Sequence, residues 1–153
     1  MTSQMSPDPI TWLLTAHAST RQHLEQLLHT PAPALDPATQ SAIAWFDSPA
    51  QLQHHILRDI LCPLLIESMA GSDAVCIKGM TQSLETQGTR LGQQWRQQIA
   101  PGLLTQPPTA TQLAAWVRDY LAYLDQADDE LLPMAARLLD DKALETIAQA
   151  CHQ

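Results

Sequence analysis

Residues 116–139 read WVRDYLAYLDQADDELLPMAARLL, which is the strongest helical pattern in the chain. Its apolar residues recur at intervals of three and four, which places them along one face of an α-helix. The stripe consists of Trp116, Val117, Tyr120, Leu124, Ala127, Leu131, Ala135 and Leu138. The spacing predicts one long amphipathic helix that begins at Thr109 or Thr111, crosses Pro133 and ends at about Leu139.

Proline and glycine divide the remaining chain into further helices. The pattern predicts helices over about 9–29, 37–46, 49–69 and 73–99, and a short terminal helix that opens at Asp140-Asp141. The segments expected between them are 30–33, a stop at Gly71 and a linker over 101–108. Glycine is scarce and no stretch alternates as a strand would, so the sequence predicts an all-α fold. We expect an up-down four-helix bundle with short additional helices, in a single domain over residues 1–153.

Composition and charge exclude several kinds of partner. Apolar residues make up 45% of the chain and charged residues 16%, as in globular proteins. The net charge is −8 and the eight basic residues are scattered, which argues against nucleic acid or an anionic membrane. The longest apolar run, residues 60–66, is too short to span a membrane. The first nine residues lack a signal-peptide pattern and the three cysteines lack CxxC spacing, so we expect reduced thiols and a cytoplasmic protein.

No motif of a common enzyme class is present: the chain has no Gly-rich phosphate loop, GxSxG, HExxH or paired CxxC. We therefore do not expect an enzyme. Histidines and tryptophans are the other candidates for function, although each can equally serve in the core or on the surface. Any tryptophan left exposed would mark a protein partner or a homodimer interface; the four are Trp12, Trp45, Trp95 and Trp116.

Two segments share a pattern of polar residues, acids, two apolar residues and proline. They are HHILRDILCP at 54–63 and residues 123–135 within the stretch quoted above. Together with His17 on the first helix, they resemble the bacterial hemerythrin-like (HHE cation-binding) family over about residues 9–140. The resemblance implies a four-helix bundle that holds a non-haem di-iron centre through histidine and carboxylate ligands. Ligands four residues apart share one helix face, so both can reach the same ions.

Matched residue by residue, the resemblance implies a degraded metal site. Metal ligands are implied at His17, His54 and Asp128, with His55 and Asp59 as alternates in another register. Other ligand positions lack the histidine or glutamate that the family has there; they hold Arg58, Gly88 and Tyr123. Helices 73–99 and 109–139 contain no histidine at all. We therefore expect no cofactor, with non-haem iron as the alternative.

This degraded site suggests that Arg58 replaces the metal. A buried aspartate needs a cation, so Arg58 is expected to pair with Asp128, while His54 and Tyr123 hydrogen-bond into the same pocket. The alternative is that Arg58 points outward and Asp128 is solvated. The favoured function is a metal-free binding or interaction module. The alternative is a metal-binding protein for oxygen, nitric oxide or iron handling, and a haem or di-iron oxidoreductase is a third hypothesis that no CxxCH motif supports.

Overall fold

The computed structural model describes residues 8–29, 37–68, 73–104 and 110–152. These residues form helices and no β-strand, so the all-α prediction is confirmed for them. Three of the helical rods contain a π-helical turn. The elements are α1 (Pro9–Leu28), α2 (Pro37–Asp47), α3 (Pro49–His55), η1 (Ile56–Leu61), α4 (Cys62–Glu67), α5 (Asp73–Gln94), η2 (Trp95–Ile99), α6 (Ala100–Leu104), α7 (Ala110–Gln126), η3 (Ala127–Leu131), α8 (Leu132–Leu138) and α9 (Asp141–Cys151).

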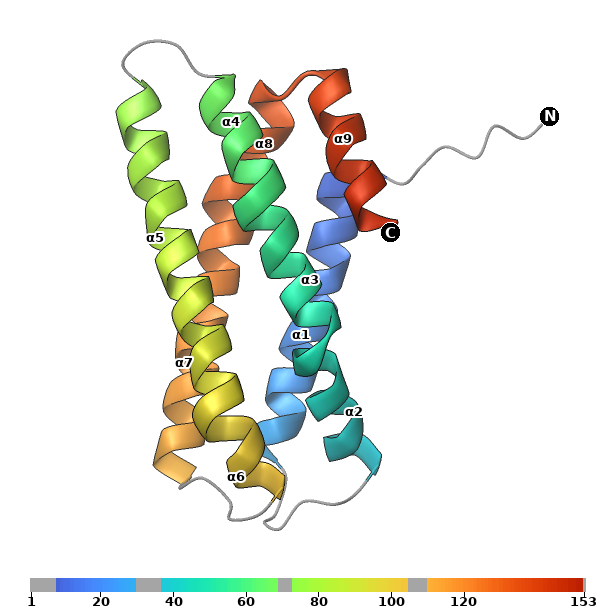
Figure 1. Cartoon of the computed structure of the whole chain (residues 1–153), viewed down its shortest axis with the longest axis vertical. Coiled ribbons are helices and arrows are strands. Elements are labelled where there is room, and N and C mark those ends of the chain that lie inside the picture. Colours follow the sequence, from blue (N-terminus) through green and yellow to red (C-terminus); the bar gives the residue numbers. More distant parts are fainter. Residues whose placement is uncertain (1–7, 30–36, 69–72, 105–109, 153) are drawn as a thin grey trace, which may run out of the picture.

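Long helical rods lie side by side along the longest axis of the molecule (Figure 1). Followed by colour, α1 descends, α3–η1–α4 ascends, α5–η2–α6 descends and α7–η3–α8 ascends. Helix α1 packs against α7, and α5 packs against both α7 and α4. The two short helices sit at the edges, where α2 contacts α1 and α9 contacts α1 and η1. This arrangement places α1 beside α7, although the two helices are far apart in the sequence.

Each π-helical turn ends two residues before a proline: Leu61 before Pro63, Ile99 before Pro101 and Leu131 before Pro133. Proline lacks an N–H, and its ring collides with the carbonyl four residues back in a regular helix. The turn widens instead, and the residue before each proline donates to the carbonyl five residues earlier. The rods therefore continue through all three prolines. The predicted linker was wrong at Pro101-Gly102, which lie inside α6.

Two of the expected helix starts carry a side-chain N-cap. The Asp8 carboxylate accepts from the Ile10 N–H and the Asp140 carboxylate accepts from the Ala143 N–H, whereas Ser48 before Pro49 makes no side-chain capping bond. The expected breaks over 30–33 and at Gly71, and the remainder of the predicted linker over 105–108, lie outside the described residues. So does Thr109, one of the two expected starts of the long helix.

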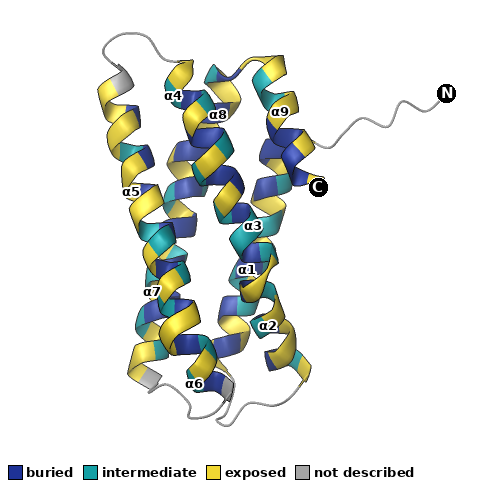
Figure 2. Ribbon diagram, in the orientation of Figure 1, coloured by how far each residue is buried: buried dark blue, intermediate teal, exposed yellow. Residues whose placement is uncertain are grey.

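The core runs along the inner faces of the rods, while their outer faces are exposed (Figure 2). The apolar stripe predicted over 116–138 is buried as far as Ala135. Beyond that point Leu139 is buried and Leu138 is only partly buried. The wider turn η3 explains this difference, because one extra residue per turn shifts the buried face by about one position. Of the cysteines, Cys62 and Cys151 are buried and Cys76 is exposed, all as free thiols.

Candidate functional site

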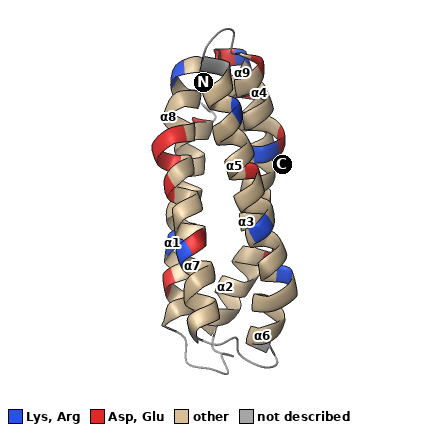
Figure 3. Cartoon of the chain, turned by 90° about the vertical axis from the view of Figure 1, so that its left-hand side faces the viewer, with Lys and Arg blue, Asp and Glu red and all other residues tan. Residues whose placement is uncertain are grey.

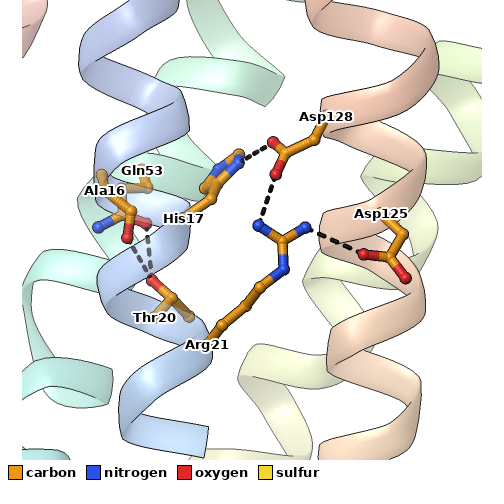
Figure 4. A network of polar contacts seen from close by, with 7 residues as sticks. All are labelled: Ala16, His17, Thr20, Arg21, Gln53, Asp125 and Asp128. Atoms are coloured by element: carbon orange, nitrogen blue, oxygen red, sulfur yellow. Dashed lines mark hydrogen bonds and ion pairs between the residues drawn. The ribbon is translucent and has the colours of Figure 1, made fainter.

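A charged network connects α1 to α7 and η3 (Figure 4). His17 and Arg21 lie one turn apart on α1 and face the same way. His17 donates from Nδ1 to Oδ1 of Asp128 over 2.6 Å. Arg21 spans two carboxylates, with Nη1 2.7 Å from Oδ2 of Asp128 and Nη2 3.0 Å from Oδ1 of Asp125. Both oxygens of Asp128 are therefore engaged by donors from α1.

Asp128 is held in its charged form by these donors. The side chain of Asp128 is 10% exposed, and burial by itself would raise the pKa of this carboxyl. The hydrogen bonds and positive charge of His17 and Arg21 outweigh burial, so the pKa of Asp128 is lowered. In the same way, burial opposes the charge on Arg21, but its bonds to the two aspartates leave the pKa of Arg21 raised. The result is a largely buried ion pair that links two rods.

The predicted pair between Arg58 and Asp128 is wrong. Arg58 instead forms two bonds with its neighbour Asp59, of 3.0 Å from Nε to Oδ1 and 2.9 Å from Nη2 to Oδ2. The two side chains are 35% and 41% exposed, so they form a surface pair. The alternate ligands His55 and Asp59 also contact each other, at 2.7 Å, but on this same exposed face. Arg58 therefore points to the exposed side of η1. The arginine that contacts Asp128 is Arg21 on α1.

A polar cluster formed by Thr20, Gln53 and Trp45 fixes α1 against α2 and α3. The Thr20 hydroxyl is 3.0 Å from the Ala16 carbonyl and 3.1 Å from Oε1 of Gln53, and Trp45 donates from Nε1 to Thr20 over 2.9 Å. Thr20 and Gln53 are buried, so the cluster sets the rotation of α1. This rotation directs His17 and Arg21 towards α7.

His54, Tyr123 and Gly88 come together from three different rods. The Tyr123 hydroxyl is 2.9 Å from Nδ1 of His54. The His54 ring lies directly against α5 at Gly88, where a Cβ would overlap the ring and sit 2.9 Å from Nε2. Only glycine leaves room for the imidazole there. The sequence hypothesis placed His54 and Tyr123 in one pocket with an Arg58–Asp128 pair. The two side chains do meet, but they bond to each other and Asp128 bonds to His17 and Arg21.

His54 is neutral and one of its nitrogens lacks a partner. Burial, together with the positive charge of Arg58, lowers the pKa of His54 to about 4. Burial also raises the pKa of the Tyr123 hydroxyl well above its usual value, so this group keeps its proton and can donate it to Nδ1. The His54 tautomer that accepts this bond at Nδ1 carries its ring hydrogen on Nε2, and it leaves the fewest buried groups unpaired. Nε2 is buried without a hydrogen-bond partner among the described residues.

This neutral histidine predicts a loss of stability in mild acid. His54 binds a proton in the unfolded chain near pH 6.5 but in the folded chain only near pH 4, so the unfolded state gains protons first as pH falls. Burial lowers the pKa of His23 as well, which acts in the same direction. Urea unfolding at pH 7 and pH 5 should show a loss of about 1–2 kcal/mol from His54 after solvent screening is allowed for.

The variant His54→Asn should lose most of this pH dependence. His29→Asn, which changes an exposed histidine at the end of α1, is the control and should retain it. Equal pH dependence in wild type and His54→Asn would contradict the assignment of a buried neutral imidazole.

A cavity of about 310 Å³ adjoins His54, between α3–η1 and the face of α5 that carries Gly88 and Gly92. Its inner wall is aromatic and buried, and its outer rim is polar and half-buried or exposed. The wall includes Phe46, Trp95, Trp116, Tyr120 and Tyr123, whose rings pack at centroid distances of 5.1–5.8 Å. Arg58 lies on the rim, so the structure does place Arg58, Gly88, His54 and Tyr123 around one pocket.

The residues present do not fit a di-iron centre. The predicted ligands contact two separate sets of partners, His17 with Asp128 and His54 with Tyr123. Within the described parts of the chain, no group of three His, Cys, Asp or Glu side chains is placed to hold a metal ion. Arg21 adds a permanent cation to the carboxylate that the resemblance assigns to iron.

One residue of the site, Arg21, was missed in the sequence, whereas Asp125 belongs to the acidic group within 125–130 whose simplest interpretation was a solvated helix face. The available signal was spacing, because Arg21 follows His17 by four residues and Asp125 precedes Asp128 by three. Each pair therefore shares a helix face. Nothing in the sequence shows that these two faces meet.

Comparisons with known proteins found no counterpart: no family model, no curated protein and no solved structure matches this chain. Among the helices in the described ranges, none combines the length and apolar character that crossing a membrane requires.

Proposed function

We propose that this chain is a hemerythrin-like domain, an up-down four-helix bundle with short added helices, that acts as a metal-free binding or interaction module. The observation that carries the proposal is the Arg21 guanidinium on Asp128. By the resemblance, Asp128 occupies a metal-ligand position, and here a side-chain cation supplies the positive charge that a buried carboxylate needs.

The second support is the way that the lost ligand positions are filled. Gly88 and Tyr123 stand at positions where the resemblance implies histidines. The His54 ring packs against Gly88 and bonds to Tyr123, so a ring and a hydrogen bond occupy the space between the rods. Side chains thereby fill the space that the resemblance assigns to a metal centre.

The same proposal covers partners and location. We propose a cytoplasmic protein that is not an enzyme and does not bind nucleic acid. On the side drawn in Figure 3, the Lys and Arg segments are separated from one another by other residues, which supports the absence of nucleic-acid binding. Trp95 and Trp116 are buried, whereas Trp12 and Trp45 are half-buried and line a surface groove on α1 and α2. A homodimer or protein partner stays a prediction, with these two tryptophans as its candidates.

Metal analysis tests the proposal. Protein produced with added iron and analysed for metals should contain well below one metal ion per chain and show no oxo-bridged ferric absorption band. The variant Cys76→Ser serves as control, because an exposed thiol can retain metal nonspecifically. One or two tightly held metals per chain, unchanged in Cys76→Ser, would reject the proposal in favour of the metal-binding alternative.

A further inference from the structure

The aromatic cavity beside His54 has an unusual charge for this chain. Acidic residues outnumber basic residues by 16 to 8 in the sequence. The described residues that line the cavity nevertheless include two arginines, Arg58 and Arg96, and no aspartate or glutamate. A wall of aromatic rings can also attract a cation, but the guanidinium groups of Arg58 and Arg96 at the rim of the cavity repel a cation. The charge therefore favours an anionic ligand.

Among the described residues, Arg58 has a carboxylate partner and Arg96 has none. Arg58 is paired with Asp59 through two bonds. Arg96 donates to the neutral Oε1 of Gln51 over 3.2 Å, and within the described ranges no carboxylate lies at ion-pair distance from it. A guanidinium without a carboxylate partner in the described part of the chain matches a monoanion, and its planar pair of donors suits a carboxylate.

The inner wall offers ring surfaces rather than hydrogen bonds. The two indole N–H groups are already used, since Trp95 donates to Asp47 over 2.8 Å and Trp116 donates to the Leu91 carbonyl over 3.1 Å. The indole rings of Trp95 and Trp116 therefore offer their carbon faces and edges to a ligand, which favours a flat aromatic group. The volume of about 310 Å³ lies at the lower end of the range for small-molecule pockets, roughly 300–1,000 Å³.

The cavity exists because α5 carries glycines one turn apart. The His54 ring fills the place of a side chain at Gly88. At Gly92 the nearest atom to an added Cβ is Nη1 of Arg96, at 3.4 Å, so the space in front of Gly92 is open. Arg96, one turn further along, lies over this opening.

We propose that this cavity binds a small aromatic carboxylate, with the ring against Trp95, Trp116 and Tyr120 and the carboxylate on Arg96. This inference rests on the proposed function, because it supplies the ligand of a metal-free binding module. His54, Gly88 and Tyr123 line the same cavity.

Calorimetric titration of the full chain tests this with three probes. Phenylacetate carries both ring and charge, 2-phenylethanol keeps the ring without the charge, and acetate keeps the charge without the ring. We expect phenylacetate to bind about tenfold more tightly than either control, a difference typical of one charge-assisted contact. Phenylacetate binding no tighter than 2-phenylethanol would overturn the proposal.

Variants locate the site. Arg96→Gln should weaken phenylacetate binding about tenfold and leave 2-phenylethanol unchanged. Arg118→Gln is the matched control, because Arg118 is exposed on α7, pairs with Asp119 and does not line the cavity. Gly92→Leu should fill the opening and abolish phenylacetate binding, while the better helix propensity of leucine preserves the fold. Full phenylacetate binding in Gly92→Leu would overturn the proposal.

Metal analysis of the same preparation separates the two proposals. A metal-containing protein rejects the proposed function whatever the titration shows. A metal-free protein that does not bind phenylacetate rejects only the ligand assignment.

Discussion

Replacing Arg21 by methionine is expected to lower the free energy of unfolding by about 3 kcal/mol. Methionine keeps the aliphatic stem of the side chain and removes the charge. Asp128, at 10% exposure, is then left with His17 alone, and Asp125 loses its partner on α1. Because Arg21 is 32% exposed, the expected loss lies at the lower end of the range for a broken buried pair. Urea unfolding measures it directly.

The matched control is Arg58→Met. Its pair with Asp59 lies on the surface, so its loss should be below about 1 kcal/mol. The two arginine variants thereby distinguish the observed network from the pairing that the sequence suggested. A cost below about 1 kcal/mol for Arg21→Met, or an equal cost for Arg58→Met, would contradict the assignment.

Gly88→Ala is expected to lower the free energy of unfolding by about 2 kcal/mol, although alanine is normally the better helix former. The added Cβ overlaps the His54 ring, which must move and break its bond to Tyr123. Gly79→Ala on the same helix is the control. Gly79 is exposed and no atom lies within 4 Å of the position that a Cβ would take there, so this change should stabilise the protein by about 0.5–1 kcal/mol.

A double-mutant cycle ascribes the effect to one contact. In a His54→Ala background the obstructing ring is gone, so Gly88→Ala should become neutral or stabilising. Denaturant unfolding of the four proteins in the cycle gives the coupling energy. A Gly88→Ala defect that persists undiminished in the His54→Ala background would show that the glycine is needed for some other reason.

Much of the fold could be predicted because helix formation is read from local spacing. The stripe over 116–138 and the caps at Asp8 and Asp140 depend on residues within one or two turns of each other. The prediction failed at Pro101 because proline was taken as a boundary. The structure retains the helix there by widening one turn, as it also does before Pro63 and Pro133.

The candidate site was predicted only in part, because local spacing does not show which helix faces meet. His54, Gly88, Tyr123 and Arg58 do surround one pocket, whereas the cation of Asp128 was assigned to the wrong arginine. Arg21 and Arg58 each lie four residues after a histidine, so spacing along the chain treats them alike. Their environments differ because α1 packs against α7, whereas the side chain of Arg58 turns to the exposed Asp59.

Local sequence patterns were enough to predict that this chain is helical and where most of its rods begin and end, and they show no histidine in 73–99 or 109–139, where the resemblance implies ligands. The packing of the helices sets which charges meet, which ring occupies the space at Gly88 and where an aromatic cavity remains. Periodicity and capping act within a single helix, but ion pairs and cavities depend on the rotation and packing of helices that are distant in the chain.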